Sequence, residues 1–179
     1  MLLKKKTAII TGCNRGIGKA ILEKFAENGA DIFACVRKES NEFTDVMMKL
    51  AVKTGVSITP VYFDFVKSEQ VKAGIKTIIS SKKKIDVLVN NAGVASGSFF
   101  QMTAMKDLKN LFEVNFFSQI LFSQGISRYM SRHKTGSIIN IASTAGLIGD
   151  AGTTSYGSSK AALMFVTKTM ATEFGERNI

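Results

Sequence analysis

The sequence predicts an α/β fold in which a doubly wound parallel sheet is flanked by helices, in a single domain that spans residues 1–179. Three observations predict it. Short β-branched runs alternate with amphipathic helical runs, a glycine-rich loop joins the first strand to the first helix, and no repeat, low-complexity tract or linker interrupts the pattern. With 45% hydrophobic residues and one proline, the chain can bury a substantial core.

The first part of the chain has the order strand, glycine loop, helix, strand. Thr7–Thr11 and Asp31–Val36 are the two expected strands, and residues 19–28 carry one apolar helical face. The loop glycines allow a tight turn and a close approach to a pyrophosphate, whose charge a helix N-terminus stabilises: Gly12, Gly16 and Gly18. Between a strand and a helix, this loop predicts a dinucleotide site, with a purely structural turn as the alternative.

The alternation of elements continues along the rest of the chain. The expected order is a helix capped by Ser40 or Asn41, a strand at 57–63, a helix capped by Ser68, a strand at 85–89, a helical segment at 103–133, a strand at 137–141 and a helical run at 161–171. Pro60 suggests that the early part of its strand is poorly paired. Asn115 is an isolated polar residue in an apolar helical segment, and a core amide satisfied by the backbone is the simplest account of it.

The stretch from Ser143 to Lys160 contains the residues best suited to catalysis. Tyr156 and Lys160 are four residues apart and would project from one face of a helix. A positive charge beside a phenol favours its ionised form, so Lys160 would help Tyr156 to give or take a proton. Ser143, at the end of a strand, could hydrogen-bond the oxygen that Tyr156 protonates. Taken alone, the pair could also be an ordinary exposed helix pair.

Charge and cysteine content exclude several classes of function. The formal net charge of +10 can attract nucleic acid, anionic lipid or an acidic partner, but the lysines form only short clusters, at 4–6 and 82–84, so no nucleic-acid partner is expected. No apolar run is long enough to span a membrane and no signal peptide is recognised, so no membrane partner is expected either. Cys13, Cys35 and a distant His133 predict no metal site and suit a reducing cytoplasm.

Several motifs occur together in the order and approximate spacing of one family. They are Thr11-Gly12-x-x-x-Gly16-x-Gly18, Asn90-Asn91-Ala92-Gly93, Asn115, Ser143 and Tyr156-x-x-x-Lys160. The whole chain resembles the compact branch of the short-chain dehydrogenase/reductase family, which has a Rossmann-like fold. Within that branch it is most similar to the 3-oxoacyl-(acyl-carrier-protein) reductases.

The resemblance implies a role for each matching residue. Tyr156 would be the catalytic acid/base, Lys160 would assist it and hold the nicotinamide ribose, and Ser143 would polarise the substrate carbonyl. Asn115 would hold a water that links Lys160 to solvent. Asp64 would meet the adenine and Asn90 the adenosine ribose, while Asn91 would tie strands together rather than touch the cofactor. The complete set of implied cofactor-binding residues is Gly12, Asn14, Arg15, Gly16, Ile17, Gly18, Arg37, Asp64, Asn90, Ala92, Gly93, Tyr156 and Lys160.

The end of the second strand predicts NADP(H) as the cofactor. Proteins that select NAD place an acidic residue there, about 20 residues beyond the glycine loop, where it hydrogen-bonds the ribose 2′-hydroxyl. Here the strand is followed by Arg37 and Lys38, and Asp31 lies at its beginning. Arg37 and Arg15 could pair with a 2′-phosphate from two sides. The alternative is that Arg37 and Lys38 form a solvated turn.

Members of the family usually continue with a sixth strand, a loop over the nicotinamide, a substrate lid and a last strand, so the fold is expected to be truncated before the sixth strand. The expected activity is NADP(H)-dependent reduction of a ketone or 3-oxoacyl group, and the substrate could be attached to acyl carrier protein. Arg128, Arg132 and Arg177 would then lie near the site entrance. A homodimer or homotetramer would form through the helices at 103–133 and 156–175. The alternatives are a cofactor-binding protein with little or no catalysis and a sugar or polyol dehydrogenase.

Overall fold

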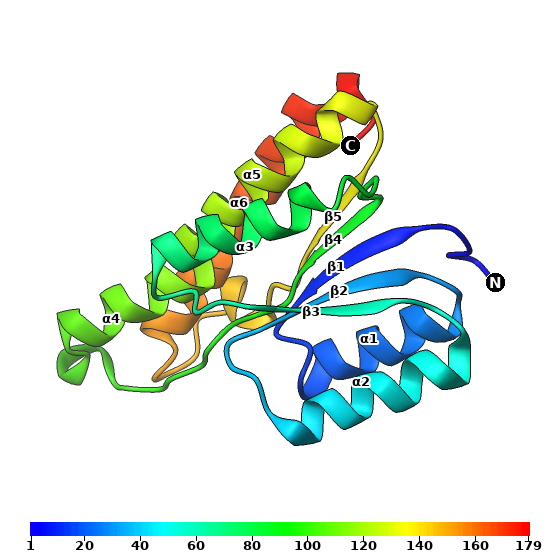
Figure 1. The fold of residues 1–179 in the computed structure, drawn as a ribbon. Helices are drawn as coiled ribbons and strands as arrows, with labels where there is room; N and C mark the ends of the chain where they lie inside the picture. Colours follow the sequence, from blue (N-terminus) through cyan, green and yellow to red (C-terminus); the bar gives the residue numbers. More distant parts are fainter.

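Five parallel strands form the centre of the computed structural model, which describes residues 1–179 (Figure 1). The strands are β1 (Thr7–Thr11), β2 (Asp31–Val36), β3 (Ile58–Tyr62), β4 (Val87–Asn90) and β5 (Ser137–Asn140). Their order across the sheet is β3-β2-β1-β4-β5. The direction of winding therefore reverses between β1 and β4, and this confirms the doubly wound α/β fold.

Helices cover both faces of the sheet (Figure 1). The lower layer in this view contains α1 (Gly16–Glu27) and α2 (Asn41–Thr54). The upper layer contains α3 (Ser68–Ser80), α5 (Ser118–His133) and α6 (Thr154–Phe174). Each layer encloses its own apolar core, because the strand residues are buried and alternate between the two faces.

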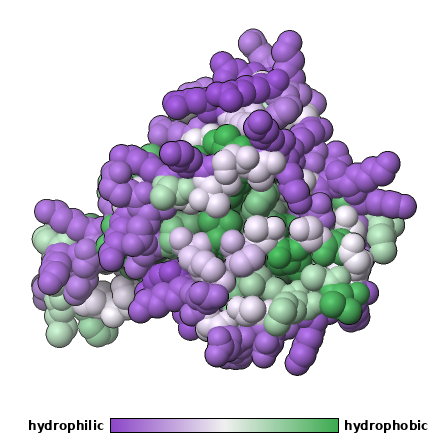
Figure 2. Space-filling view, in the orientation of Figure 1, coloured by the Kyte–Doolittle hydropathy of each residue, from purple (hydrophilic) through white to green (hydrophobic).

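Between β4 and α5 the chain forms an arm that projects from the body of the molecule (Figure 1). The arm contains a 3-10 turn (Phe100–Met102) and α4 (Met105–Phe112), and Figure 2 shows a pale hydrophobic area at its end. A π-helical turn (Glu113–Phe117) joins α4 to α5, so the helical segment expected at 103–133 is present but is not one regular helix. Two further 3-10 turns lie at Thr144–Gly146 and Gly175–Arg177.

At the helix amino termini the structure agrees with the sequence expectations for α2 and differs from them for α1 and α3. α1 begins at Gly16, directly in the glycine loop, rather than near Lys19. Ser40 caps α2 as expected, its Oγ accepting a hydrogen bond from the Phe43 amide at 3.3 Å. Ser68 does not cap α3: it is the first residue of that helix, and the preceding Lys67 makes no side-chain cap.

Pro60 is paired with β2 along with the rest of its strand. β3 pairs with β2 in register from Ile58 to Tyr62, and Pro60 lies opposite Ala34. The expectation of a poorly paired first half was therefore wrong. β3 is an edge strand, so the missing amide of Pro60 can face the side that has no neighbour.

None of the helices combines the length and the apolar character that crossing a bilayer would require.

Candidate active site

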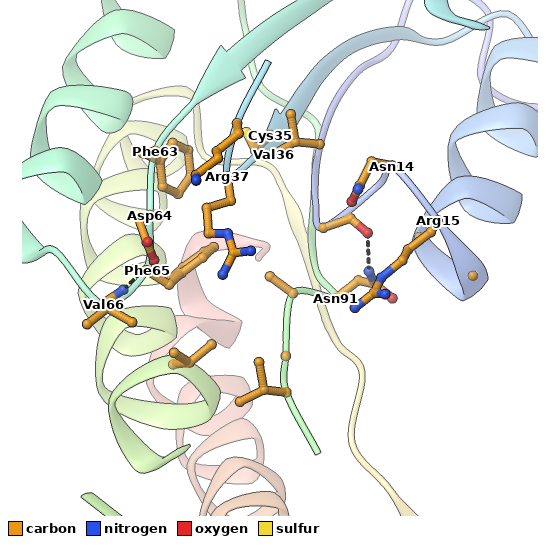
Figure 3. A pocket seen from close by; sticks show the side chains of 18 of the residues that line it. Asn14, Arg15, Cys35, Val36, Arg37, Phe63, Asp64, Phe65, Val66 and Asn91 are labelled. Carbon is orange, nitrogen blue, oxygen red and sulfur yellow. Dashed lines mark hydrogen bonds between the residues drawn. The ribbon is translucent and has the colours of Figure 1, made fainter. Parts of the chain in front are cut away.

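A cleft of about 670 Å³ opens at the carboxyl ends of β1, β2, β3 and β4, where the strand order reverses (Figure 3). Ligands of doubly wound sheets bind at this position, because the loops after the strands diverge there. The lining comes from the carboxyl ends of these strands and the segments that follow them, together with Val114 of the π-helical turn. Its residues are Gly12, Asn14, Arg15, Gly16, Ile17, Gly18, Cys35, Val36, Arg37, Lys38, Glu39, Ser40, Phe63, Asp64, Phe65, Val66, Asn91, Ala92, Gly93, Val94 and Val114.

The glycine loop has the shape of a phosphate cradle. Gly12 has φ +65°, and a Cβ on it would lie 2.8 Å from the Cα of Ala92. A Cβ on Gly18 would collide with the Gly12 carbonyl and with the Asn91 amide. Gly16, with φ +56°, has open space beside it, and α1 begins at this residue. The loop thus exposes backbone amides at a helix N-terminus, the arrangement that binds a pyrophosphate.

Asn91 joins the glycine loop to the end of β4. Its Nδ2 donates to the carbonyls of Thr11 and Gly12 at 2.9 and 3.0 Å. The amides of Asn91 and Ala92 in turn donate to the Thr11 hydroxyl at 3.0 and 2.9 Å. Asn91 therefore connects strands, as the resemblance implied, and it also lines the cleft.

Two arginines face each other across the cleft. Arg15 reaches in from the glycine loop and Arg37 from the end of β2 (Figure 3). Asp31 lies at the opposite end of β2, where it accepts a hydrogen bond from the Ser57 amide at 2.9 Å and pairs with Lys83. The only acidic side chains that line the cleft are Glu39, three residues beyond β2, and Asp64 after β3.

Asp64 lines the cleft, and its carboxylate also accepts a hydrogen bond from the backbone of the same loop. Its Oδ1 accepts a hydrogen bond from the Val66 amide at 3.0 Å, which closes a turn after β3 (Figure 3). This turn places Phe65 and Val66 on the cleft wall. The motif comparison missed both residues, although their position after a buried strand could have indicated them.

Asn90 does not line the cleft. Its buried side chain donates to Ser123 Oγ at 2.7 Å and to Asn140 Oδ1 at 2.8 Å, and so it joins β4 to α5 and β5. The side chain of Asn90 is thus used inside the fold, because the alternation of side chains along a strand turns it inward. The contact with the adenosine ribose that the resemblance implied for Asn90 stays a prediction.

Lys160 lies behind the Ala92–Val94 segment, at the end of the cleft. Its Nζ donates to the Ile141 carbonyl at 2.8 Å, and the side chain is only 4% exposed. Burial lowers the pKa of Lys160 from its ordinary value. A Cβ on Gly93 would lie 3.6 Å from this Nζ, so the absence of a side chain there leaves Lys160 room beside the cleft.

Asn115 is held in the π-helical turn next to Lys160. Its Oδ1 accepts from the Val94 amide and its Nδ2 donates to the Val94 carbonyl, both at 2.8 Å, and Nδ2 also donates to Ser159 Oγ at 3.2 Å. The account of a core amide satisfied by the backbone therefore holds for its side chain. The same bonds fix the loop that covers Lys160.

The turn that Ser143 caps packs against the helix that carries Tyr156 and Lys160. The Lys160 Nζ lies 5.9 Å from the centroid of the Tyr156 ring, so the pair shares one face of α6. The Ser143 Oγ accepts from the Ala145 amide at 3.2 Å and caps the short turn after β5. A Cβ on Gly157 would lie 2.5 Å from the Ala145 carbonyl, so this turn packs directly on the first turn of α6.

Gln119 is a residue of the site that sequence reasoning missed. Its buried Nε2 donates to the Ala92 carbonyl at 2.5 Å, while its Oε1 has no partner. Gln119 and Asn115 lie one turn apart, so two amide side chains hold the same short loop from behind. A polar residue at i+4 from Asn115 was the available signal.

The fold and the cleft define a dinucleotide-binding α/β protein. The chain belongs to the short-chain dehydrogenase family: the family model described as "short chain dehydrogenase" matches residues 6–179. This confirms the resemblance found in the motifs, and it assigns the protein to a family of oxidoreductases that use a nicotinamide cofactor.

Curated relatives and solved structures support the same family. The chain is 34% identical over 179 residues to a 3-oxoacyl-[acyl-carrier-protein] reductase FabG of Thermotoga maritima, and covers 72% of that protein. It is 31% identical over 177 residues to the 3-oxoacyl-[acyl-carrier-protein] reductase of Synechocystis sp., and covers 71% of it.

Two of the similar solved structures contain different cofactors. L-sorbose reductase from Gluconobacter frateurii, complexed with NADPH and L-sorbose, matches 98% of this chain with a TM-score of 0.90 and 32% identity. A 7α-hydroxysteroid dehydrogenase complexed with NADH and 7-oxo glycochenodeoxycholic acid matches 99% with a TM-score of 0.90 and 34% identity. The chain spans 66% and 68% of their lengths, respectively.

Proposed function

We propose that the protein is an NADP(H)-dependent reductase that converts a ketone or 3-oxoacyl group to a hydroxyl group, with Tyr156 as the proton donor. The observation that carries the proposal is the position of Lys160. Its Nζ donates to the Ile141 carbonyl oxygen at 2.8 Å, and it lies near both the Tyr156 ring and Gly93, which lines the cleft. A buried ammonium beside a phenol at the end of a dinucleotide cleft is suited to a proton transfer coupled to hydride transfer.

Each residue of the site then has a distinct task. The bound cofactor supplies the hydride for the carbonyl carbon. Tyr156 gives its proton to the carbonyl oxygen, and the Lys160 ammonium stabilises the phenolate that remains. Ser143 donates a hydrogen bond to the same oxygen as negative charge develops. Asn115 and a water held beside it would return a proton to Lys160.

Arg15 and Arg37 support NADP(H) rather than NAD(H). Both arginines line the cleft from opposite sides, and the residue directly after β2 is Arg37 instead of an acid. Pairing of a 2′-phosphate with such a guanidinium contributes about 1.5–3 kcal/mol. Glu39 lies farther along the loop, directly before Ser40, the N-cap residue of α2.

A 3-oxoacyl substrate is favoured by the curated relatives, several of which are named 3-oxoacyl-[acyl-carrier-protein] reductases. An acidic acyl carrier protein is then a natural partner.

The position expected for the arginines that would receive it, near the site entrance, differs in the structure. The reason is that α5 and α6 run antiparallel to the strands. Their carboxyl ends meet at the start of β5, where the Gly136 amide donates to the Asn178 carbonyl at 3.1 Å. Arg128, Arg132 and Arg177 therefore lie toward the end of the sheet opposite the cleft.

Two exposed aromatic side chains support association through α5 and α6. Phe117 and Phe165 are 54% and 73% exposed, on the two helical segments expected to form a homodimer or homotetramer. Pairing with a second copy would cover them. The two cysteines are buried thiols, which suits an enzyme that works in a reducing cytoplasm.

Replacement of Tyr156 by phenylalanine tests the proposed role. Oxidation of NADPH in the presence of an acetoacetyl thioester should fall by at least about 100-fold, because the proton donor is lost. NADPH binding, measured by fluorescence titration, should stay nearly unchanged. Equal losses of turnover and of cofactor affinity would contradict the role.

The same assay separates the alternatives. If the protein reduces L-sorbose faster than the acetoacetyl thioester, it is a sugar reductase. L-Sorbose is the sugar to test because the chain is similar to L-sorbose reductase. Tight NADPH binding without turnover of either substrate by the unmodified protein would favour a cofactor-binding protein with little catalysis.

A further inference from the structure

Two lysine clusters that are far apart in the sequence meet at the amino-terminal end of the sheet. Residues 4–6 precede β1, residues 82–84 precede β4 and Lys134 precedes β5, and these three strands are neighbours. Adjacent strands lie about 4.8 Å apart, so the turns before them form a continuous row. All seven residues are exposed. Together they form the lysine face: Lys4, Lys5, Lys6, Lys82, Lys83, Lys84 and Lys134.

A buried carboxylate holds the two clusters together. Asp86, only 8% exposed, accepts a hydrogen bond from the Thr7 amide at 3.0 Å. The same carboxylate pairs with Lys6 at 3.2 Å and with Lys84 at 3.1 Å, one lysine from each cluster. The two clusters therefore lie close together because β1 pairs with β4, and their proximity does not depend on flexible side chains.

The lysine face carries half of the net charge of the chain. Asp31 and Asp86 are the acids that pair with it, so seven lysines leave a net charge of +5 out of the total of +10. Four of the lysines have no acidic group within 4 Å: Lys4, Lys5, Lys82 and Lys134. Nearby charges do not cancel the surplus. Lys24 pairs with Glu27, Glu176 is followed directly by Arg177, and Arg132 adds a further positive charge.

The chemistry of the lysine face fits an anionic lipid surface better than nucleic acid. Its charges are all ammonium groups, which act as point charges and lack the planar fork with which arginine reads phosphates and bases. Two apolar side chains, Met1 and Leu2, lie next to it and are 77% and 90% exposed. Lysines with adjacent exposed apolar side chains bind anionic membranes, where the charges attract headgroups and the apolar groups enter the interface.

The lysine face and the cleft lie at opposite ends of the strands. Five residues of β1 alone separate them by roughly 16 Å. We propose that the lysine face docks the protein on membrane surfaces rich in anionic phospholipid, with the cleft directed into solution. This revises the expectation of no membrane partner, and it concerns surface contact rather than a membrane span.

Flotation with lipid vesicles tests the proposal, because bound protein rises with the vesicles while free or aggregated protein does not. Phosphatidylcholine vesicles that contain phosphatidylserine should carry the protein upward, and pure phosphatidylcholine vesicles should not. The double variant Lys4→Glu/Lys82→Glu should bind at least about tenfold more weakly. The control Lys49→Glu/Lys76→Glu changes the total charge equally on exposed residues of α2 and α3, and it should bind like the unmodified protein.

Three outcomes would overturn the proposal. The first is the absence of flotation with phosphatidylserine at physiological salt. The second is an equal loss in the two double variants, which would trace binding to total charge. The third is tighter binding to duplex DNA than to vesicles at equal phosphate concentration.

The substitution Leu2→Ser should weaken vesicle binding and leave DNA binding unchanged. Normal NADPH binding by each variant shows that it is folded.

Discussion

At the scale of single residues, the site depends on where charges are buried. Lys160 is almost completely buried yet has no acidic partner, and its ammonium donates a hydrogen bond only to the Ile141 carbonyl. Such a group is costly to keep charged, and burial lowers its pKa for that reason. A buried lysine without an acidic partner is a candidate for a role in chemistry rather than in stability.

The lowered pKa of Lys160 predicts a pH dependence of stability. Because the folded pKa lies below the ordinary value of 10.5, the unfolded state binds more protons between the two values, and stability rises with pH there. The protein should therefore gain stability relative to Lys160→Met as the pH is raised from neutral toward 10.5. Thermal melts of both proteins across this range would show it, and a constant difference in Tm would contradict it.

Arg37 predicts the choice of cofactor. Replacement by aspartate should weaken NADPH binding by at least about tenfold, because the charge-assisted bond to the 2′-phosphate is replaced by repulsion. NADH binding should improve or stay unchanged. Titration of both cofactors into Arg37→Asp and into the control Arg128→Asp measures the effect. An unmodified protein that prefers NADH would refute the NADP(H) assignment.

At the scale of elements, the π-helical turn positions a loop. Asn115 bonds Val94 through both amide atoms, and Gln119 bonds the Ala92 carbonyl, so residues on both sides of Gly93 are tied to one helix. Lys160 lies against the same loop. The helical segment thus sets how far the cleft wall stands from Lys160.

Gln119→Met should loosen this loop without emptying the core. Leaving the Ala92 carbonyl without its donor costs about 1–3 kcal/mol, and removal of the unpartnered Oε1 offsets part of the loss. Amide exchange at Gly93 and Val94 should accelerate, and NADPH binding should weaken. The exposed Gln124 on the same helix offers a control, Gln124→Met, which should alter neither quantity.

At the scale of the whole molecule, β5 forms one edge of the sheet and has no neighbour on its outer side. Ile138 packs into the core, so the next residue, Ile139, points to the opposite face and is 41% exposed. A groove of about 170 Å³, lined by both apolar and polar residues, lies between β5 and α6. An open edge beside apolar surface favours association between chains.

Residues 1–179 on their own should therefore self-associate or unfold at low temperature. Ile139→Lys should reduce the association, because a charge on an edge strand opposes pairing with another strand. Light scattering and thermal melts would be compared with Val52→Lys, which adds the same charge on α2 at a residue that is 86% exposed. A monodisperse, cooperatively melting 1–179 would contradict the prediction.

The sequence alone determined the elements and most of the site. Alternating apolar periods placed all five strands, and the spacing of Tyr156 and Lys160 placed both on one helical face, because these features depend on neighbours within a few residues. The glycine loop was equally local. The turn after β3 was missed because it depends on a single carboxylate–amide bond of Asp64, which has no periodic signal.

Only the tertiary structure decided which distant residues meet. It turned Asn90 away from the cleft, carried Arg128, Arg132 and Arg177 toward the other end of the sheet, and joined two lysine clusters around Asp86. The physical reason is the parallel sheet. A parallel sheet brings the carboxyl ends of all its strands together on one side and their amino ends on the opposite side, even when the strands are remote in sequence. The helices return the chain from the first side to the second.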